Sequence, residues 1–169
     1  MKAESCPIEV IDDRKKFQET RIPQIAGEFD LKKVVVEPNN IRYGGVVAIG
    51  PLDWSAKCGH HGVGIHGEAY FAYIPDKKII GLSMSARILE YFANVTKEIL
   101  QEEVNMQIVD FYYKTIKPKG VWLVMKAVHE CMTARGVKQR NALTTTSDMR
   151  GVFHKDSALR DEVLKLWKL

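Results

Sequence analysis

Hydrophobic positions along this chain switch between strand-like and helix-like spacing, and the switches predict its elements. Runs of β-branched or alternating apolar residues predict strands over residues 32–37, 41–49, 67–74, 121–129 and 143–153. Apolar residues three or four apart predict helices over residues 82–93, 97–114 and 156–169. Asn94 or Thr96 is expected to cap the second helix, and Asp156 or Ser157 the third. A turn is predicted at Gly50-Pro51.

The order of these elements indicates the fold class. After a polar N-terminal part, expected to hold a helix interrupted near Pro23, the chain reads as strands, two helices, strands and a closing helix. This order is typical of an α+β fold in which an antiparallel sheet carries its helices on one face. No internal repeat or low-complexity linker divides the 169 residues, which suit one compact domain.

Composition narrows the class of protein. The apolar fraction is 46% and the charged fraction 27%, as in ordinary globular proteins, and the formal net charge of +4 suits an anionic small molecule as well as a weak polyanion contact. The sequence has no Lys/Arg tract of the kind that binds nucleic acids, and it has no apolar run long enough to span a membrane. Three cysteines and an N-terminus without a signal-peptide core favour a reducing, cytoplasmic setting, with Cys6 as an unpaired thiol.

Two short segments carry the candidate chemistry. Cys58-Gly59-His60-His61 and His129-Glu130-Cys131 hold two of the three cysteines and three of the five histidines. Thiolate and imidazole are preferred ligands of Zn²⁺, and a set of two sulfurs and one nitrogen leaves a position open, as in catalytic zinc sites. The two remaining histidines, His60 and His129, are then available to move protons.

A plainer interpretation of the same residues stays open at this point. A single cysteine is more often a small core residue than a ligand, and adjacent histidines can lie on a surface without a role. The spacing of the two segments is also looser than that of a zinc finger. Only the two segments taken together favour a metal site.

A series of further motifs, in a fixed order, resembles a known family. From Cys58 to about Leu169 the chain is similar to GTP cyclohydrolase I, of the tunnelling-fold superfamily. The resemblance rests on Cys-x-His-His at 58–61, Ala72-Tyr73-Ile74-Pro75, Gly81-Leu82-Ser83, Ala86-Arg87-Ile88, Gln101-Glu102, His129-x-Cys131-Met132, Arg135-Gly136-Val137, Thr144-Thr145-Thr146-Ser147 and Gly151-Val152-Phe153.

The resemblance implies roles for the residues of the two segments. Cys58, His61 and Cys131 would ligate Zn²⁺, the one cofactor expected. His60 and His129 would act as acid and base beside the reacting imidazole ring of the substrate.

It also implies a substrate-binding set. Glu102, with Gln101, would recognise the guanine edge by accepting its N–H groups. Arg87 and Arg135 would face the phosphates, where a guanidinium group binds two oxygens at once, and Ser83 would lie near them. Without the family context Glu102 would be assigned to a solvated helix face, Arg87 and Arg135 to the surface, and Ser83 to an ordinary helix cap.

The implied fold and reaction follow. Residues 1–50 would form a short N-terminal extension, and residues 51–169 the catalytic region, whose four-stranded antiparallel sheet with two helices on one face assembles into a barrel-like homo-oligomer, expected as a decamer with interfacial active sites. The implied reaction is hydrolysis of GTP to 7,8-dihydroneopterin triphosphate and formate, the first step of folate, pterin or 7-deazaguanine synthesis.

Three departures from the family pattern keep alternatives open. Gly59 stands where the family has Glu, Met84 where it has a phosphate-binding Lys, and fewer residues than usual precede Cys58. One alternative is a zinc hydrolase that takes another nucleotide or stops at a ring-opened formamidopyrimidine. Another is a catalytically silent tunnelling-fold subunit that works by binding.

Overall fold

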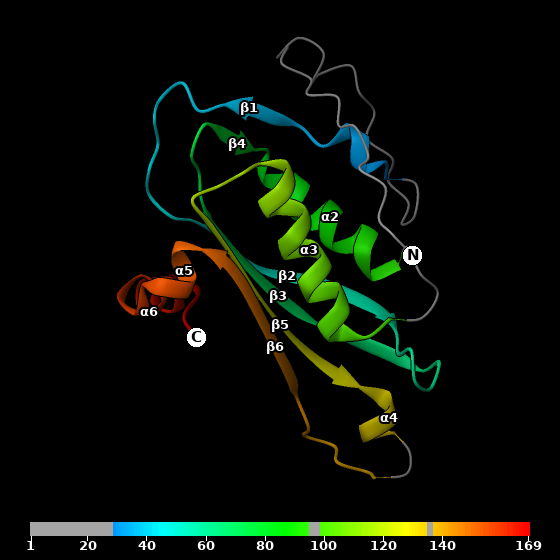
Figure 1. Cartoon of the computed structure of the whole chain (residues 1–169). Helices are drawn as coiled ribbons and strands as arrows, with labels where there is room; N and C mark the ends of the chain where they lie inside the picture. Colours follow the sequence, from blue (N-terminus) through cyan, green and yellow to red (C-terminus); the bar gives the residue numbers. More distant parts are fainter. Residues whose placement is uncertain (1–28, 95–98, 135–136) are drawn as a thin grey trace.

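A four-stranded antiparallel sheet forms the centre of the molecule (Figure 1). The computed structural model describes residues 29–94, 99–134 and 137–169. The strands lie in the order β2-β3-β5-β6, and each neighbouring pair is antiparallel. Their bounds are β2 Val47–Lys57, β3 Gly64–Ile74, β5 Gly120–His129 and β6 Thr144–Gly151. The predicted α+β class with an antiparallel sheet is confirmed.

The first long strand, β2, passes through the predicted turn. The sequence predicts a strand over residues 41–49 and a turn at Gly50-Pro51, but β2 begins at Val47 and continues to Lys57. Its pairing with β3 shifts register between Ile49 and Leu52, so Gly50-Pro51 forms a bulge. Gly50 has a φ of 148°, which side-chain-bearing residues rarely adopt. The turn prediction was wrong because a bulge uses the same residue types as a turn.

Two long helices cover one face of the sheet (Figure 1). These are α2 Leu82–Asn94 and α3 Gln101–Thr115, close to the predicted ranges; residues 95–98, with Thr96, lie outside the described part. The prediction that Asn94 or Thr96 caps the second helix was wrong, because Asn94 ends α2 and the N-cap of α3 is Leu100, which makes no side-chain cap hydrogen bond. The ring of Tyr112 in α3 packs 4.1 Å, centroid to centroid, from that of Phe71 in β3. The buried apolar residues that these helices contribute to the main core are Met84, Ile88, Leu89, Ala93, Val104, Ile108, Val109 and Tyr112.

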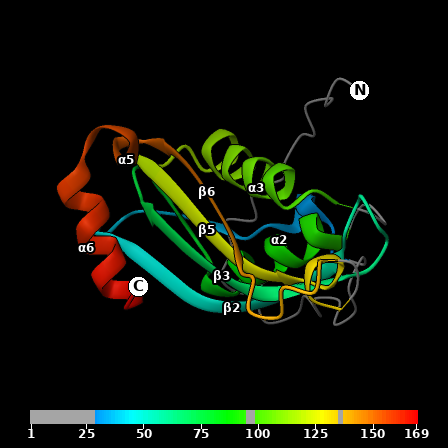
Figure 2. The same cartoon turned by 90° about the horizontal axis from the view of Figure 1, so that it is seen from below.

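A second, smaller core lies on the opposite face of the sheet, because successive strand residues point to opposite sides. It is covered by α5 Val152–Lys155 and α6 Ser157–Trp167, and the side chain of Asp156 caps α6 as predicted. The rings of Trp167 and Trp122 lie 5.1 Å apart. Figure 2 shows α6 across the sheet from α2 and α3. The expectation that all helices share one face is therefore wrong for the C-terminal helix.

The N-terminal part adds a short two-stranded sheet, in which β1 Val36–Pro38 pairs with β4 Lys78–Ile80. A 3-10 helix, η1 Leu31–Lys33, replaces the first half of the strand predicted over residues 32–37, because the Asp30 carboxylate accepts the Lys32 N–H at 2.9 Å and closes a turn. The helix expected within residues 12–29 falls almost entirely outside the described residues. Of the described helices, none is long and apolar enough to cross a bilayer.

Candidate metal and catalytic site

The first candidate segment forms a tight turn at the end of β2. The Cys58 N–H donates to the Val63 carbonyl at 2.8 Å, and the Cys58 carbonyl accepts the N–H groups of His61 at 3.2 Å and Gly62 at 2.8 Å. Gly62 has a φ of 64°, which glycine adopts at low cost. The turn winds around Cys58 and leaves its Sγ 3.9 Å from Nδ1 of His61.

This turn is held against the residues that lead into α3. The Gly59 N–H donates to the Ile99 carbonyl at 2.7 Å, and the Ile99 N–H donates to the Lys57 carbonyl at 3.0 Å. A Cβ at position 59 would lie 3.0 Å from the Ile99 carbonyl oxygen, tighter than most real contacts. The Gly59 departure from the family pattern therefore coincides with a close backbone approach.

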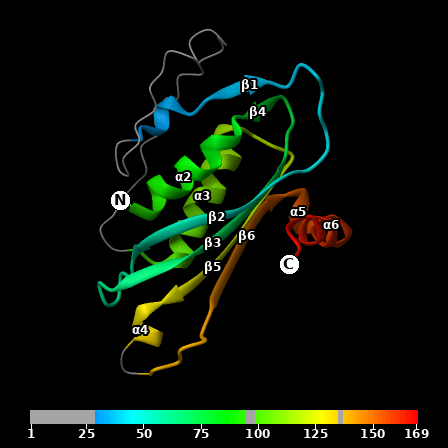
Figure 3. The ribbon, with the colours of Figure 1, turned by 180° about the vertical axis from the view of Figure 1, so that it is seen from behind.

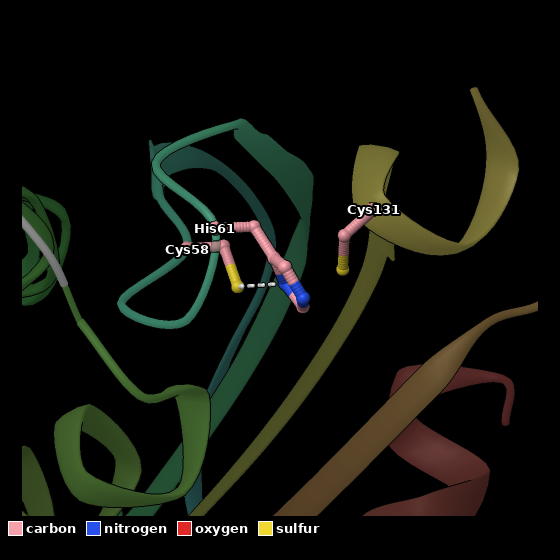
Figure 4. A group of neighbouring side chains, drawn as sticks. All are labelled: Cys58, His61 and Cys131. Atoms are coloured by element: carbon pink, nitrogen blue, oxygen red, sulfur yellow. Dashed lines mark hydrogen bonds between the residues drawn. The ribbon is translucent and has the colours of Figure 1, made fainter. Parts of the chain in front are cut away.

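The second segment reaches the turn from the end of β5. The β3–β5 ladder extends to His129, and the short helix α4 Glu130–Thr133 begins directly after it. The ligand atoms of Cys58, His61 and Cys131 all lie within 4.8 Å of one another (Figure 4). Residues about seventy positions apart in the sequence thus converge at one end of the sheet.

The donor set fits a zinc ion. Around tetrahedral Zn²⁺, ligand atoms lie about 3.6 to 3.8 Å apart, as follows from bond lengths of about 2.3 Å to sulfur and about 2.0 Å to nitrogen. The 3.9 Å between Sγ of Cys58 and Nδ1 of His61 is close to this spacing, and Sγ of Cys131, within 4.8 Å of both residues' ligand atoms, needs a shift of at most about an ångström. Two sulfurs and one nitrogen also leave a fourth position for water or substrate.

Beside these residues, His129 is held in one orientation by Gln101. The Gln101 amide nitrogen donates to the carbonyls of Met125 at 3.0 Å and Thr144 at 3.4 Å, and to Oγ1 of Thr146 at 3.1 Å. Carbonyls only accept, so the amide cannot be turned around, and its oxygen faces Nε2 of His129 at 2.8 Å. Nε2 therefore carries a proton, and Nδ1 is the basic nitrogen of the neutral ring.

The surroundings of His129 favour that neutral ring. Burial lowers the pKa of His129 from its usual value; the negative charge of Glu102 acts in the opposite direction, and His60 lowers the pKa further. His60 itself is exposed, with its ring centroid 6.0 Å from that of His61. Two imidazoles of different exposure thus flank the candidate metal ligands, an arrangement suited to proton transfer.

The substrate-binding residues predicted from the sequence fall into separate places. Glu102 is exposed in the first turn of α3, beside His129. Gln101 is only 1% exposed, and its amide is fully used inside the chain. Ser83 and Arg87 belong to the first half of α2. Arg135 lies outside the described residues.

The first half of α2 lies far from the candidate metal ligands. In Figure 3 the turn after β2 and α4 occupy one end of the sheet, and the start of α2, next to β4, is near the other. The intervening strand β3, Gly64–Ile74, has ten residue steps of about 3.3 Å. One chain therefore brings together Cys58, His60, His61, Glu102, His129 and Cys131, but not Ser83 and Arg87.

Met84 occupies the core rather than the surface. The Met84 side chain, on α2, is fully buried in the main core. Ser83, the residue before it, is exposed. The side chain at the position of the family lysine therefore points into the main core of this chain.

Sequence reasoning missed the residues that support this site. Thr146 accepts from the amides of both Gln101 and Asn105, at 3.1 Å each. The Glu130 carboxylate accepts the Gly64 N–H at 2.9 Å across 66 residues of sequence. No pattern in the sequence pairs such residues; the polar positions Gln101 and Asn105 on the inward stripe of a helix were the available signal.

Comparison with known proteins adds independent findings. A model of the family described as GTP cyclohydrolase I matches residues 9–168. The chain is 38% identical over 161 residues to GTP cyclohydrolase 1 of Aquifex aeolicus, which covers 92% of this chain and 86% of that protein. It is 42% identical over 124 residues to GTP cyclohydrolase 1 of Chlorobium chlorochromatii, covering 73% of this chain and 55% of the relative.

Among solved structures, the chain is similar to an archaeosine synthase QueF-Like in the apo form. The TM-score is 0.46 and the identity 14%, over 63% of this chain and 93% of that one.

Proposed function

We propose that this chain, which belongs to the GTP cyclohydrolase I family, hydrolyses GTP to 7,8-dihydroneopterin triphosphate and formate in a zinc-dependent reaction. The observation that carries the proposal is the convergence of Cys58, His61 and Cys131, with His60 and His129 beside them. A purely structural metal site would have no need of two further histidines at the open side. The product would enter folate, pterin or 7-deazaguanine synthesis, in the cytoplasm.

Cys58, His61 and Cys131 would hold the metal. A Zn²⁺ ion bound by them supplies a Lewis acid that makes water reactive at neutral pH. Cys58 is buried and His61 exposed, so the ligands close the protein side of the site and leave the solvent side open to substrate.

Proton transfer falls to the two histidines. Nε2 of His129 carries a proton and donates it in a hydrogen bond to the Gln101 oxygen. Nδ1 is therefore the atom that takes up and returns a proton while the imidazole ring of guanine opens. His60, exposed on the metal-binding turn, is placed to serve as the second proton carrier.

Substrate recognition is divided between Glu102 and the phosphate residues. The exposed Glu102 carboxylate would accept the N–H groups of the guanine edge. Gln101 was predicted to share this task, but its amide is buried and already bonded to Met125 and His129. Gln101 would therefore act by holding His129 and not by contacting guanine. Ser83, Arg87 and Arg135 would bind the phosphates.

A complete site would then need two copies of the chain. Ser83 and Arg87 lie in the half of α2 that is remote from the metal ligands of the same chain. The phosphates of a nucleotide bound at the metal ligands would therefore meet Ser83 and Arg87 of a neighbouring copy. The outer strands of the sheet, β2 and β6, offer backbone edges for such assembly. We therefore propose a homo-oligomer, a decamer, with active sites between subunits.

Product analysis by mass spectrometry tests the proposal. Zinc-loaded protein is incubated with GTP and, in parallel, with GDP, GMP and dGTP; dihydroneopterin triphosphate and formate are expected from GTP. His129→Ala should lower turnover by about 10²- to 10⁴-fold while retaining zinc. His154→Ala, an exposed histidine of α5 remote from the metal ligands, is the matched control and should be unchanged.

Other outcomes would favour the alternatives. A formamidopyrimidine, or turnover of another nucleotide only, would indicate a related hydrolase; the buried Met84 in place of a cationic residue is the observation behind this second candidate. No product from any nucleotide, with zinc bound and the oligomer intact, would contradict the enzyme and favour a binding subunit.

A further inference from the structure

The candidate metal ligands come from two separate pieces of chain that must be kept at a fixed spacing. Cys58 and His61 lie on the turn after β2, which is closed by its own backbone hydrogen bonds. Cys131 lies on α4, which follows β5. A metal held by both pieces depends on whatever fixes the distance between the turn and α4.

Backbone pairing between the two pieces ends just short of the metal ligands. The last partners in the β3–β5 ladder are Ile65 and His129, after which β5 turns into α4. The next residue of β3, Gly64, directs its N–H to the side where β5 has ended. The Glu130 carboxylate accepts a hydrogen bond from this N–H at 2.9 Å. A side-chain oxygen thus stands where a backbone carbonyl of β5 would accept if the ladder continued.

Gly64 and Glu130 are matched in shape as well as in hydrogen bonding. A Cβ at position 64 would lie 2.8 Å from both Cδ and Oε1 of Glu130 and would push the carboxylate away. Glu130 is itself exposed, so this contact does not belong to the hydrophobic core. Glu130 lies directly between His129 and Cys131, so a shift of the backbone at this position would move a candidate base and a candidate ligand together.

We propose that Glu130 is a positioning residue of the metal centre, which sets the distance from Cys131 to Cys58 and His61 through the Gly64 N–H and does not itself bind the metal. The inference rests on the proposed function only in that the three ligands bind zinc. It assigns to this carboxylate a part of the zinc affinity, and it makes zinc binding sensitive to a side chain at position 64 that displaces the carboxylate.

Zinc affinity, measured on the full-length protein by competition with a chromogenic chelator, tests this role without recourse to activity. Glu130→Leu should weaken zinc binding about tenfold, the lower end of the usual range for residues that orient ligands, because the carboxylate is exposed. Glu130→Gln keeps an accepting oxygen and should stay within about threefold of the parent. Glu103→Leu, which removes another exposed acid from the first turn of a helix, is the matched control and should have no effect.

The partner glycine provides a second, independent perturbation. Gly64→Ala should weaken zinc binding about as much as Glu130→Leu, and the double variant should be no weaker than the weaker single variant, because both changes break one contact. The thiolate-to-metal bands of the Co²⁺-substituted protein should be unchanged in all variants, since the ligand set is intact.

The outcomes separate this inference from the proposed function. A parent protein that binds no zinc would contradict the proposed metal site. A parent that binds zinc, with Glu130→Leu and Gly64→Ala binding it equally well, would overturn the positioning role alone. Losses that multiply in the double variant, or a changed Co²⁺ spectrum in Glu130→Leu, would also overturn it, the latter by making Glu130 a ligand.

Discussion

Replacing Gln101 by leucine separates support of His129 from direct recognition of guanine. The change keeps the approximate volume of the side chain and removes all of its hydrogen bonds. The His129 ring then loses the acceptor that holds its Nε2 proton at 2.8 Å. Because Gln101 is 1% exposed, water cannot readily take the place of the lost amide.

The hydrogen bonds lost in Gln101→Leu set the size of its effects on stability and on kcat. Thr146 keeps the amide of Asn105 as a partner, so the main losses are the carbonyl of Met125 and the half-buried His129 ring. Each buried polar group left without a partner costs about 1 to 3 kcal/mol, and the added apolar burial of leucine offsets about 1 kcal/mol. A net loss of about 2 kcal/mol corresponds to a fall in Tm of about 4 to 8 °C for a chain of this size. The misplaced base should lower kcat by about ten- to a hundredfold.

Steady-state kinetics and thermal unfolding at one protein concentration measure both effects. Gln101→Glu keeps an acceptor for His129 but turns a carboxylate toward two carbonyls, so it should lose more stability than Gln101→Leu and retain more kcat. Gln107→Leu, which removes only a surface contact to Glu103 on the same helix, is the control and should stay within about 0.5 kcal/mol of the parent. A rise in KM for Gln101→Leu at constant kcat would contradict the supporting role of Gln101 and indicate that Gln101 binds guanine directly.

Three further outcomes are expected. Gly67→Ala should cost about 3 kcal/mol or more in chemical denaturation, because its Cβ would overlap the Lys126 carbonyl oxygen, whereas Gly44→Ala, with open space around it, should be neutral. Asp110→Asn should cost about 0.5 to 1 kcal/mol at low salt and less at high salt, because the carboxylate and its partner Arg150 are both partly exposed. Removal of zinc by a chelator should abolish turnover yet leave the far-ultraviolet circular dichroism unchanged, because the ligands lie at one end of the sheet and Cys58 is the only fully buried ligand among the many apolar residues of the main core.

The central elements of the fold could be predicted from the sequence because their apolar periodicity is long and uninterrupted. β5 and the helices α2 and α3 lie within a few residues of their predicted ranges. The bulge at Gly50-Pro51 and the side of the sheet taken by α6 could not be predicted in the same way. A bulge and a turn share residue types, and an amphipathic helix such as α6 fits either face until the aromatic residues Trp122 and Trp167 are seen to meet.

The candidate site shows the same division between local and distant information. The ligand chemistry of Cys58, His61 and Cys131 is visible in the sequence, and the structure brings their ligand atoms together. The burial of Gln101 and the contact of Glu130 with Gly64 depend on which residues face each other across strands and helices. Such pairings arise from three-dimensional packing, and one sequence without its fold carries no sign of them.

The pairing register of β3 and β5 links the stability of the fold to the chemistry of the site. His129 faces α3 because it lies on the same side of β5 as Met125 and Ala127, and a slip of one residue would turn it to the opposite face. Gly67 opposes Ala127, and the strands approach so closely there that a Cβ would lie 2.6 Å from the Ala127 Cα. Gly67 thus permits the close pairing of β3 and β5 in the register from which His129 reaches Gln101. Any substitution that loosens this pairing should therefore lower activity before it unfolds the chain.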